Sequence, residues 1–459
     1  MPTPRPPRRS SPLVRALSPL RDFLRTEAAG GIMLITAAVV ALVWANSPWK
    51  GAYEDLWNSR VAIRVAGHAL DLDLRHWVND GLMSLFFLVV GLEIKREVTS
   101  GHLAGRRAAL LPVAAAIGGM VVPAAIYLAI AGRTASHGWG VPMATDIALA
   151  VGVLTLVGTR VPGGLRAFLL GLAVVDDIGA IVVIAVFYST GVSFGWLAAA
   201  AAAVVSAVVV HRLGVHHTAV FAVIGAAVWV ALHEAGVHPT IAGVVMGLLA
   251  PVTPRITPEL IDVEELNDLT TVEHARRSAG EARDSVSTVE WLEHVLHPWT
   301  SYVIVPIFAL ANTGVEVSSH SLRVAASSPI TWGIIAGLLA GKPLGILLAT
   351  RLATRSGMAD RPEGSTPRSL LGTGHAAGIG FTVALFVAEL AFTTDEEIAD
   401  AKVAILVASV VSGLLAYFVL RGAPAPEPVR AAADLPAADL PDGDLAAADL
   451  PDEPGDPLA

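Results

Sequence analysis

The sequence predicts an all-α protein that crosses a membrane about twelve times, and three observations lead to that prediction. Of the 459 residues, 54% are hydrophobic and only 15% are charged, whereas about 25% of the residues of a soluble domain are charged. Mean hydropathy is +0.62, and apolar runs of about 20 residues, the length of a transmembrane helix, recur along most of the chain. Within one such run, residues 168–188, two aspartates stand side by side, Asp176 and Asp177.

Twelve apolar segments are expected to form the spans, and an even number places both chain termini on one side. With the N-terminus in the cytoplasm, 23 of the 31 Lys and Arg residues fall on the cytoplasmic side, seven fall outside, and only Lys342 lies within a span. Because Lys and Arg concentrate in cytoplasmic loops, we expect a multi-pass protein of a cell (plasma) membrane with both termini in the cytoplasm. The expected spans are about 30–46, 76–94, 108–131, 142–158, 164–188, 194–211, 217–234, 237–250, 299–317, 330–352, 369–392 and 397–420.

Several segments outside the spans have a composition of their own. Residues 1–25 form a basic arm, and residues 422–459 form an acidic tail with nine acids and one Arg. Neither can bury a core, so we expect both to be disordered on either side of a membrane domain at 26–421. At 60–74, apolar and polar residues alternate with period two, which predicts a small external β-hairpin; its strand edges could pair with a second copy to form a homodimer. Residues 252–298 are expected to form a long cytoplasmic loop that ends in a short amphipathic segment.

Composition also excludes several kinds of protein. Cysteine is absent, so neither a disulfide framework nor a thiolate metal site is available, and no cofactor is expected. The net charge of −9 comes almost entirely from the acidic tail, and no nucleic-acid partner is expected. Arg8 and Arg9 are not followed closely by a hydrophobic core, so no cleaved signal peptide is expected.

The aspartate pair is costly where it stands. An ionised carboxylate at the centre of a bilayer costs roughly 2.5–3.5 kcal/mol even on the lower scales. Two adjacent carboxylates also repel each other, which favours protonation of at least one. Binding a small cation or taking up protons relieves both costs, so Asp176 and Asp177 indicate cation and proton transport.

Two other charged residues need an explanation. Asp146 follows Thr145 at the start of the fourth span, and both are strong helix N-cap types. Asp146 is therefore either a plain N-cap at the membrane surface or a deeper residue, since the approach at 138–145 is apolar. Lys342 has about ten apolar or small residues on each side, too many for its ammonium group to reach water, so we expect a buried counter-charge.

Glycines weaken the eleventh span. Gly374, Gly378 and Gly380 surround His375 in what is otherwise an apolar helix. An interrupted helix is tolerated only where it lines a cavity or lies inside the protein. Close packing against another helix is the alternative reason for such glycines, and the sequence leaves both open.

Acidic residues and histidines gather at the cytoplasmic ends of two spans. Glu93 lies within the second apolar run and Glu97 follows it, although an ordinary positive-inside terminus explains the basic residues between them. Glu293, His294 and His297 close the long cytoplasmic loop. Histidine titrates near neutral pH, so this cluster could sense the cytoplasmic pH.

With these motifs in hand, the sequence resembles the NhaA family of sodium/proton antiporters over most of its length, from about residue 22 to 420. Each motif alone could arise by chance, but together and in this order they are highly specific. The motifs are FFLVVGLEIKRE at 86–97, PMATDIA at 142–148, LAVVDDIGA at 172–180, LEHVLHPW at 292–299, GKPLG at 341–345 and GIGFT at 378–382.

The resemblance implies an inverted-repeat antiporter fold in which the spans at 142–158 and 369–392 are broken and cross near the midplane, as in the NhaA antiporters that define this architecture. Asp177, with Asp176, would bind the transported Na⁺ or Li⁺. Asp146 would offset the positive N-terminal ends of the half-helices. Lys342 would offset their negative C-terminal ends, each end carrying about half a charge.

The resemblance also implies regulation and stoichiometry. Glu93, Glu97, Glu293 and His294 would form a pH-responsive cluster, while the breaks would be made by the residues Thr145, Gly378 and Gly380. Two protons would exchange for one Na⁺, an electrogenic reaction that serves pH and sodium homeostasis. The chain departs from compact family members in its longer segment 252–291 and in its acidic tail.

Two other classes of protein share some of these features. A sodium-coupled symporter of a small organic anion uses broken helices too, but it needs a larger polar pocket than these spans supply. An intramembrane aspartyl protease is the enzyme alternative. It needs two aspartates on different helices, typically within a Gly-x-Gly-Asp signature, and here Asp176 and Asp177 share one helix. We therefore expect a transporter and not an enzyme.

Overall fold

A computed structural model describes residues 27–65, 68–189, 191–215, 217–253 and 285–424. The basic arm, most of the long loop and nearly all of the acidic tail lie outside these ranges, so the predictions made for them stay predictions. The described chain is almost entirely helical, apart from one two-stranded antiparallel sheet.

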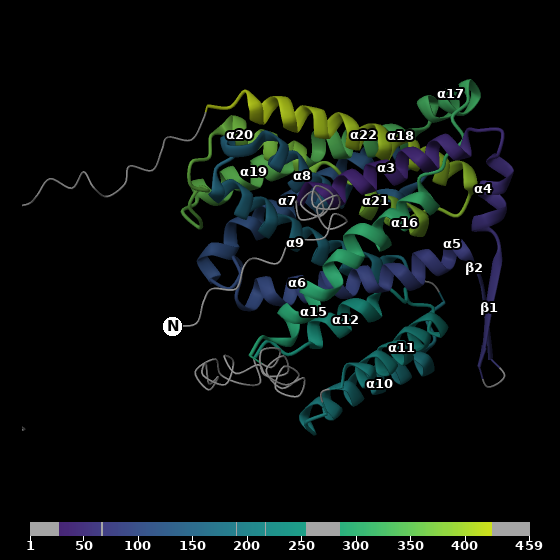
Figure 1. Cartoon of the computed structure of the whole chain (residues 1–459). Coiled ribbons are helices and arrows are strands. Elements are labelled where there is room, and N and C mark those ends of the chain that lie inside the picture. Colours follow the sequence, from purple (N-terminus) through teal and green to yellow (C-terminus); the bar gives the residue numbers. More distant parts are fainter. Residues whose placement is uncertain (1–26, 66–67, 190, 216, 254–284, 425–459) are drawn as a thin grey trace, which may run out of the picture.

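The helices and strands follow in this order along the chain (Figure 1). The first half contains α3 (Glu27–Ala45), α4 (Lys50–Trp57), β1 (Arg60–Val65), β2 (His68–Asp73), α5 (Leu74–His76), η1 (Trp77–Leu82), α6 (Met83–Thr99), α7 (Arg106–Ala131), η2 (Ser136–Met143), α8 (Ile147–Val157), η3 (Gly158–Arg160), α9 (Gly163–Phe187), α10 (Phe194–Arg212), α11 (Thr218–Glu234) and α12 (Ile241–Leu249). The second half contains α15 (Thr288–Trp299), η5 (Thr300–Ile304), α16 (Val305–Asn312), α17 (Ser319–Ser327), α18 (Pro329–Ala336), η6 (Gly337–Gly341), α19 (Lys342–Arg355), α20 (Pro367–Ala377), α21 (Phe381–Ala391) and α22 (Asp395–Arg421).

The polytopic membrane fold is confirmed at the level of class. Within the described ranges, eight helical segments are long and apolar enough to cross a membrane, or ten if each of two bent pairs is one span. One bent pair is α20 with α21, which meet at 47°. The expected number of twelve stays a prediction, because α11 and α12 are shorter than a full span.

Two expectations about the spans were wrong. The span expected at 299–317 begins earlier, because α15, η5 and α16 form one continuous helical segment, Thr288–Asn312, which includes the amphipathic segment expected before residue 299. Lys342 is also not alone inside a span, because Lys402 lies within Asp395–Arg421 and is buried. Lys402 was overlooked because the acidic residues in the first turn of α22 make this part of the sequence resemble a loop.

The hairpin and the end of α22 mark opposite ends of the molecule (Figure 1). The predicted hairpin is confirmed, with Arg60 paired to Asp73 and Val65 to His68 at its two ends. Large apolar side chains face outward along the helices, as expected of surfaces that contact lipid; examples are Val43, Leu156, Phe187, Val223, Leu352 and Phe418.

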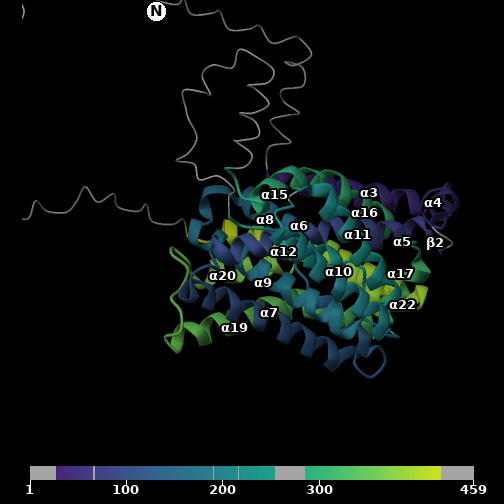
Figure 2. The ribbon, with the colours of Figure 1, turned by 90° about the horizontal axis from the view of Figure 1, so that it is seen from below.

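Helices α7 and α19 lie side by side in both views of the molecule (Figure 2). Glycines allow this approach: a Cβ atom added at Gly345 would lie 2.0 Å from the Gly118 carbonyl oxygen. Small residues serve the same purpose wherever membrane helices pack closely. The contact matters for the site, because α19 begins with Lys342.

We expect Gly345→Ala to destabilise the protein by about 1–3 kcal/mol, the usual cost of overpacking a close contact. Gly195→Ala is the matched control, because a Cβ there meets nothing within 4 Å. Thermal unfolding in detergent measures both variants. Equal melting temperatures for the two would contradict the close packing of α7 against α19.

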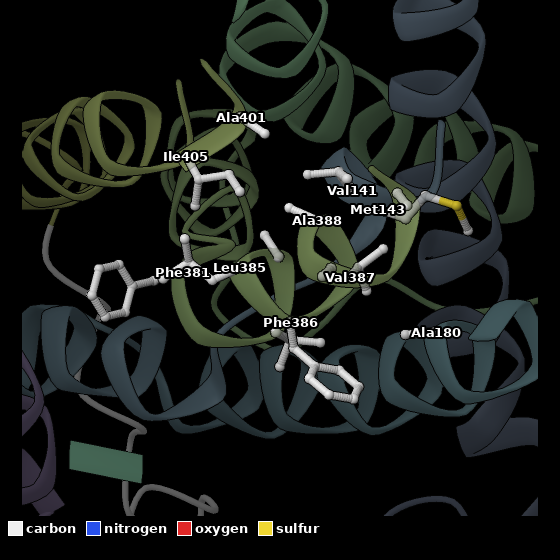
Figure 3. Close-up of a cluster of buried hydrophobic side chains, with 14 of the residues drawn as sticks. Val141, Met143, Ala180, Phe381, Leu385, Phe386, Val387, Ala388, Ala401 and Ile405 are labelled. Carbon is white, nitrogen blue, oxygen red and sulfur yellow. The ribbon is translucent and has the colours of Figure 1, made fainter. Parts of the chain in front are cut away.

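The core of the molecule surrounds α21. Its side chains Leu385, Val387 and Ala388 lie between Val141, which precedes α8, and Ile405 of α22 (Figure 3). Every residue of α21 from Phe381 to Ala388 is buried. This half-helix is therefore held on all sides by protein, which is where an interrupted helix is tolerated.

Candidate functional site

Two interrupted helices cross at the centre of the site. The chain is extended at residues 144–146, between η2 and α8, and the helix is broken again at 378–380, between α20 and α21. The breaks contact each other directly: the Asp146 amide donates to the Ile379 carbonyl at 2.6 Å, and the Thr145 hydroxyl lies 3.0 Å from the Ala377 carbonyl. The two broken segments predicted at 142–158 and 369–392 are thus present, and they cross.

The glycines of the second break serve close packing as well as interruption. A Cβ atom at Gly378 would lie 2.6 Å from both the Leu338 carbonyl oxygen and the Ser412 hydroxyl. At Gly380 it would lie 3.2 Å from the Leu338 side chain of η6. Both reasons that the sequence left open for these glycines therefore apply.

Asp146 caps two helices at once and is buried, with 2% of its surface exposed. One carboxylate oxygen accepts from the Leu149 amide at 3.0 Å, which caps α8. The other accepts from Thr382 of α21, from its hydroxyl at 2.6 Å and its amide at 3.2 Å. A carboxylate therefore faces the positive ends of two half-helices, where a negative charge is favourable. Asp146 is therefore an N-cap that is buried inside the protein.

Lys342 is completely buried and pairs with Asp176. Its Nζ lies 2.9 Å from Oδ2 of Asp176, with both side chains fully inaccessible. The same ammonium group donates to the carbonyl of Met143, the last residue of η2. The Thr145 hydroxyl lies 2.8 Å from the same Asp176 oxygen. The buried counter-charge expected for Lys342 is thus found, and the ammonium also contacts the carbonyl end of a half-helix.

Asp177 and the second oxygen of Asp176 are left without partners. Oδ1 of Asp176 is buried and accepts no hydrogen bond. The Asp177 side chain is only 5% exposed, and nothing in the described ranges pairs with it. Unpaired carboxylate oxygens inside a protein are rare because they lose the solvation of water. These atoms are free to bind a hard cation, which prefers oxygen ligands, or a proton.

The expected pH-responsive cluster is brought together only in part. Arg96 of α6 pairs with Glu293 of α15, with 2.5 Å between Nη1 and Oε1, so this contact joins the two helices. Glu97 is buried and accepts from the amide and ring of His102 at 2.7 and 2.9 Å. His294 is exposed, and its side chain has no hydrogen bond or ion pair among the residues that the structure describes.

The sequence interpretation missed several residues near the site. Thr382 was quoted within a motif but given no role, although it bonds to Asp146 twice. Glu389 of α21 and Lys402 of α22 form a buried ion pair, with 2.5 Å between Oε1 and Nζ. The rule that singled out Lys342 would have found Glu389, which stands within an apolar run, but not Lys402, which follows the acidic first turn of α22.

The fold and site together define a class of protein. Two interrupted helices that cross inside a membrane domain, beside buried acidic and basic side chains, are the arrangement of ion-coupled secondary transporters, the NhaA antiporters among them. A family model described as Na⁺/H⁺ antiporter 1 matches residues 21–420, so the chain belongs to that family.

Curated relatives agree with this assignment. A protein of Sorangium cellulosum named Na(+)/H(+) antiporter NhaA 2 is 47% identical over 418 residues, which cover 88% of this chain and 89% of the relative. A Myxococcus xanthus protein of the same name is 46% identical over 91% of this chain and 92% of its own length. An Oleidesulfovibrio alaskensis protein named Na(+)/H(+) antiporter NhaA is 44% identical over 89% and 95%.

Proposed function

We propose that this chain is a secondary antiporter that exports Na⁺, or Li⁺, in exchange for protons at Asp177 and Asp176. One observation carries the proposal: beside the crossing of two broken helices, Oδ1 of Asp176 is buried without a hydrogen bond, and the neighbouring Asp177 is buried without a partner among the described residues. Family membership supports it, because the family is one of sodium/proton antiporters. Backbone carbonyls released by the breaks would supply further oxygen ligands.

Exchange follows from competition for the same oxygen atoms. Na⁺ is a hard cation and binds carboxylate oxygens. When it leaves, uncompensated carboxylates in a water-poor site take up protons, because burial and mutual repulsion both disfavour their ionised forms. The site therefore holds Na⁺ or protons and not both. Release on opposite sides of the membrane then couples the two fluxes.

The proposed stoichiometry is two protons inward for each Na⁺ outward. Two carboxylates, on Asp176 and Asp177, can each carry one proton, while together they bind one monovalent cation. One net positive charge then enters per cycle, so the membrane potential contributes about 2.3 kcal/mol per 100 mV to Na⁺ export. The proposal requires that Lys342, which pairs with Asp176 in the structure, gives up this ion pair when Asp176 takes a proton.

The topology belongs to the same proposal. Both termini face the cytoplasm of a bacterial cell, the protein spans the inner membrane, and the hairpin lies outside. The excess of Lys and Arg on the proposed cytoplasmic side supports this orientation. A homodimer would form through the hairpin, β1 and β2, whose outer edges carry unpaired backbone groups.

Inside-out vesicles acidified by respiration test the function. Addition of Na⁺ or Li⁺ should release protons and restore the fluorescence of a quenched pH dye, with a rate that depends on pH. A response to K⁺ equal to that to Na⁺ would contradict the proposed selectivity. A response to Na⁺ that requires an added organic anion would favour the symporter instead.

We further propose that the contact between α6 and α15 makes exchange depend on cytoplasmic pH. Glu293→Gln removes the charge that pairs with Arg96, so it should move the pH midpoint of exchange by about one unit even at saturating Na⁺, a shift equivalent to about 1.4 kcal/mol. His294→Ala should move the pH midpoint by less than Glu293→Gln does, because His294 forms no ion pair with α6 among the described residues. The dye assay across a pH series measures the midpoint.

Glu54→Gln is the control for this prediction, since Glu54 is exposed on α4, far along the chain from the cluster. Competition between Na⁺ and protons at Asp177 alone would also give a pH-dependent rate. Under pure competition, however, saturating Na⁺ removes any difference between Glu293→Gln and the unmodified protein. That result would overturn the sensor.

A further inference from the structure

The break between α20 and α21 leaves backbone groups that Thr145 and Asp146, ahead of α8, satisfy only in part. A helix end exposes amides or carbonyls that need partners from outside the helix. Gly380 stands at the N-cap position of α21 and supplies no capping side chain. Asp146 accepts from the Thr382 amide, but the Phe381 amide donates to a different helix. The His375 carbonyl accepts from the Gly378 amide at 3.0 Å and accepts a second hydrogen bond from that same helix.

That helix is α22. The Phe381 amide donates to the Ser409 hydroxyl at 3.2 Å, and the Ser412 hydroxyl donates to the His375 carbonyl at 2.9 Å. Both serines are buried, with 5% and 0% of their surfaces exposed. In the middle of a continuous helix of 27 residues, they thus cap both sides of a break in another helix.

The ion pair of Glu389 and Lys402 fastens the far end of α21 to the same helix. Lys402, Ser409 and Ser412 follow each other at seven and three residues, so they lie along one side of α22. From Phe381 to Glu389 is about 12 Å of helix, and from Ser409 to Lys402 about 10 Å, at 1.5 Å per residue. The two antiparallel segments therefore match in length, and α21 is attached to α22 at both ends. Between these points, Ile405 packs in the apolar core around α21 (Figure 3).

We propose that Ser409, Ser412 and the Lys402–Glu389 pair are positioning residues for ion exchange. They hold α21 so that Thr382 reaches Asp146, and they hold the end of α20 so that the Ala377 carbonyl reaches Thr145. Thr145 in turn contacts Asp176. The inference rests on the proposed ion site, and it extends the machinery to a helix that contributes no ligand to that site.

The serine variants give the first test. Ser409→Ala and Ser412→Ala should each raise the apparent KM for Na⁺ about fivefold, the effect of one lost net hydrogen bond, and the double variant more than tenfold. The pH profile should move with the KM, because Asp146 and Asp176 lose their fixed partners. Ser206→Ala is the matched control: among the residues that the structure describes, the Ser206 hydroxyl donates only to a carbonyl of its own helix, α10.

A second control distinguishes positioning of the ion site from a general effect on stability: a variant that lowers the stability in another part of the molecule. Val228→Ala truncates a side chain that is 1% exposed in a separate core cluster of α10, α11 and α12. It should lower the melting temperature without changing the KM for Na⁺. If Ser409→Ala and Ser412→Ala behave like Val228→Ala, with lower stability and an unchanged KM and pH profile, the inference is wrong.

The ion pair gives the second test. Lys402→Met should raise the KM several-fold, and the exchanged pair, Lys402→Glu with Glu389→Lys, should restore it. Should Lys402→Met not assemble, Lys402→Met with Glu389→Gln replaces it, since that double variant leaves no unpaired buried charge. Unchanged KM in a folded variant that lacks the pair would contradict the role of Lys402. Exchange that survives Asp177→Asn would instead overturn the ion site itself, so the two failures differ.

Discussion

Asp177→Asn should abolish the exchange of Na⁺ for protons while the protein still folds and inserts. An amide has nearly the size of a carboxylate, but it neither carries a negative charge nor takes up a proton at physiological pH. Asp177 has no hydrogen bond or ion pair within the described chain, so the substitution breaks no contact. It also removes a buried charge, which is costly to keep away from water. We therefore expect a loss of rate of at least about a hundredfold, as for a group on which the whole reaction depends, with equal or higher thermal stability.

The dye assay in inside-out vesicles measures the rate, and the melting temperature in detergent measures the fold. Asp55→Asn is the control: Asp55 is exposed on α4, so this variant should behave like the unmodified protein in both assays. Normal rates of proton release by Asp177→Asn would show that the ions bind elsewhere.

Asp176→Asn should cripple exchange as well, but with a different physical signature. Asp176 is paired with Lys342 at 2.9 Å and contacts Thr145. Its substitution leaves a buried ammonium group without a counter-charge, and removal of one partner of a buried pair is strongly destabilising. Both variants should therefore lose activity, but Asp176→Asn should have a lower melting temperature than Asp177→Asn.

The class of fold and the burial of the residues proposed as the ion site were predictable because lipid makes charge expensive. Few charged residues occur in the spans, so Asp177 and Lys342 stood out against their apolar neighbours, and each proved to be buried. The crossing of the two broken helices came from resemblance to a family. From Pro142 and the glycines alone, the sequence indicated weak points in two helices but not that Asp146 and Ile379 would meet.

What the sequence could not predict are partners that lie far apart in the chain. Nothing in the serine hydroxyls of α22 indicates that Ser409 and Ser412 cap a break some thirty residues earlier, because serine is common in helices of membrane proteins. Lys402 was missed because it follows the acidic first turn of α22 and so resembles a residue at the membrane surface. His294 was grouped with Glu293 because the family resemblance implies a pH-responsive cluster, although of the two only Glu293 forms an ion pair with α6 among the described residues.

The second large effect is expected for Lys342→Ala, which should lower stability and exchange together. Lys342 is fully buried, and its ammonium group contacts both Asp176 and the carbonyl of Met143. Truncation leaves the Asp176 carboxylate without its counter-charge, at a cost of about 3–5 kcal/mol. Lys342→Arg keeps the positive charge and should retain more of both properties. Lys50→Ala is the control, because Lys50 pairs with Glu316 on the surface, and such pairs contribute little.

A double variant separates the two roles of Lys342. Lys342→Met with Asp176→Asn removes the buried charges together, and replacing a whole buried pair by groups of similar volume is often neutral for stability. We expect the melting temperature to return most of the way to that of the unmodified protein. Exchange should stay lost, since one of the two carboxylates that bind Na⁺ and protons is gone. Wild-type stability and activity in Lys342→Ala would contradict this account and leave Lys342 without a part in transport.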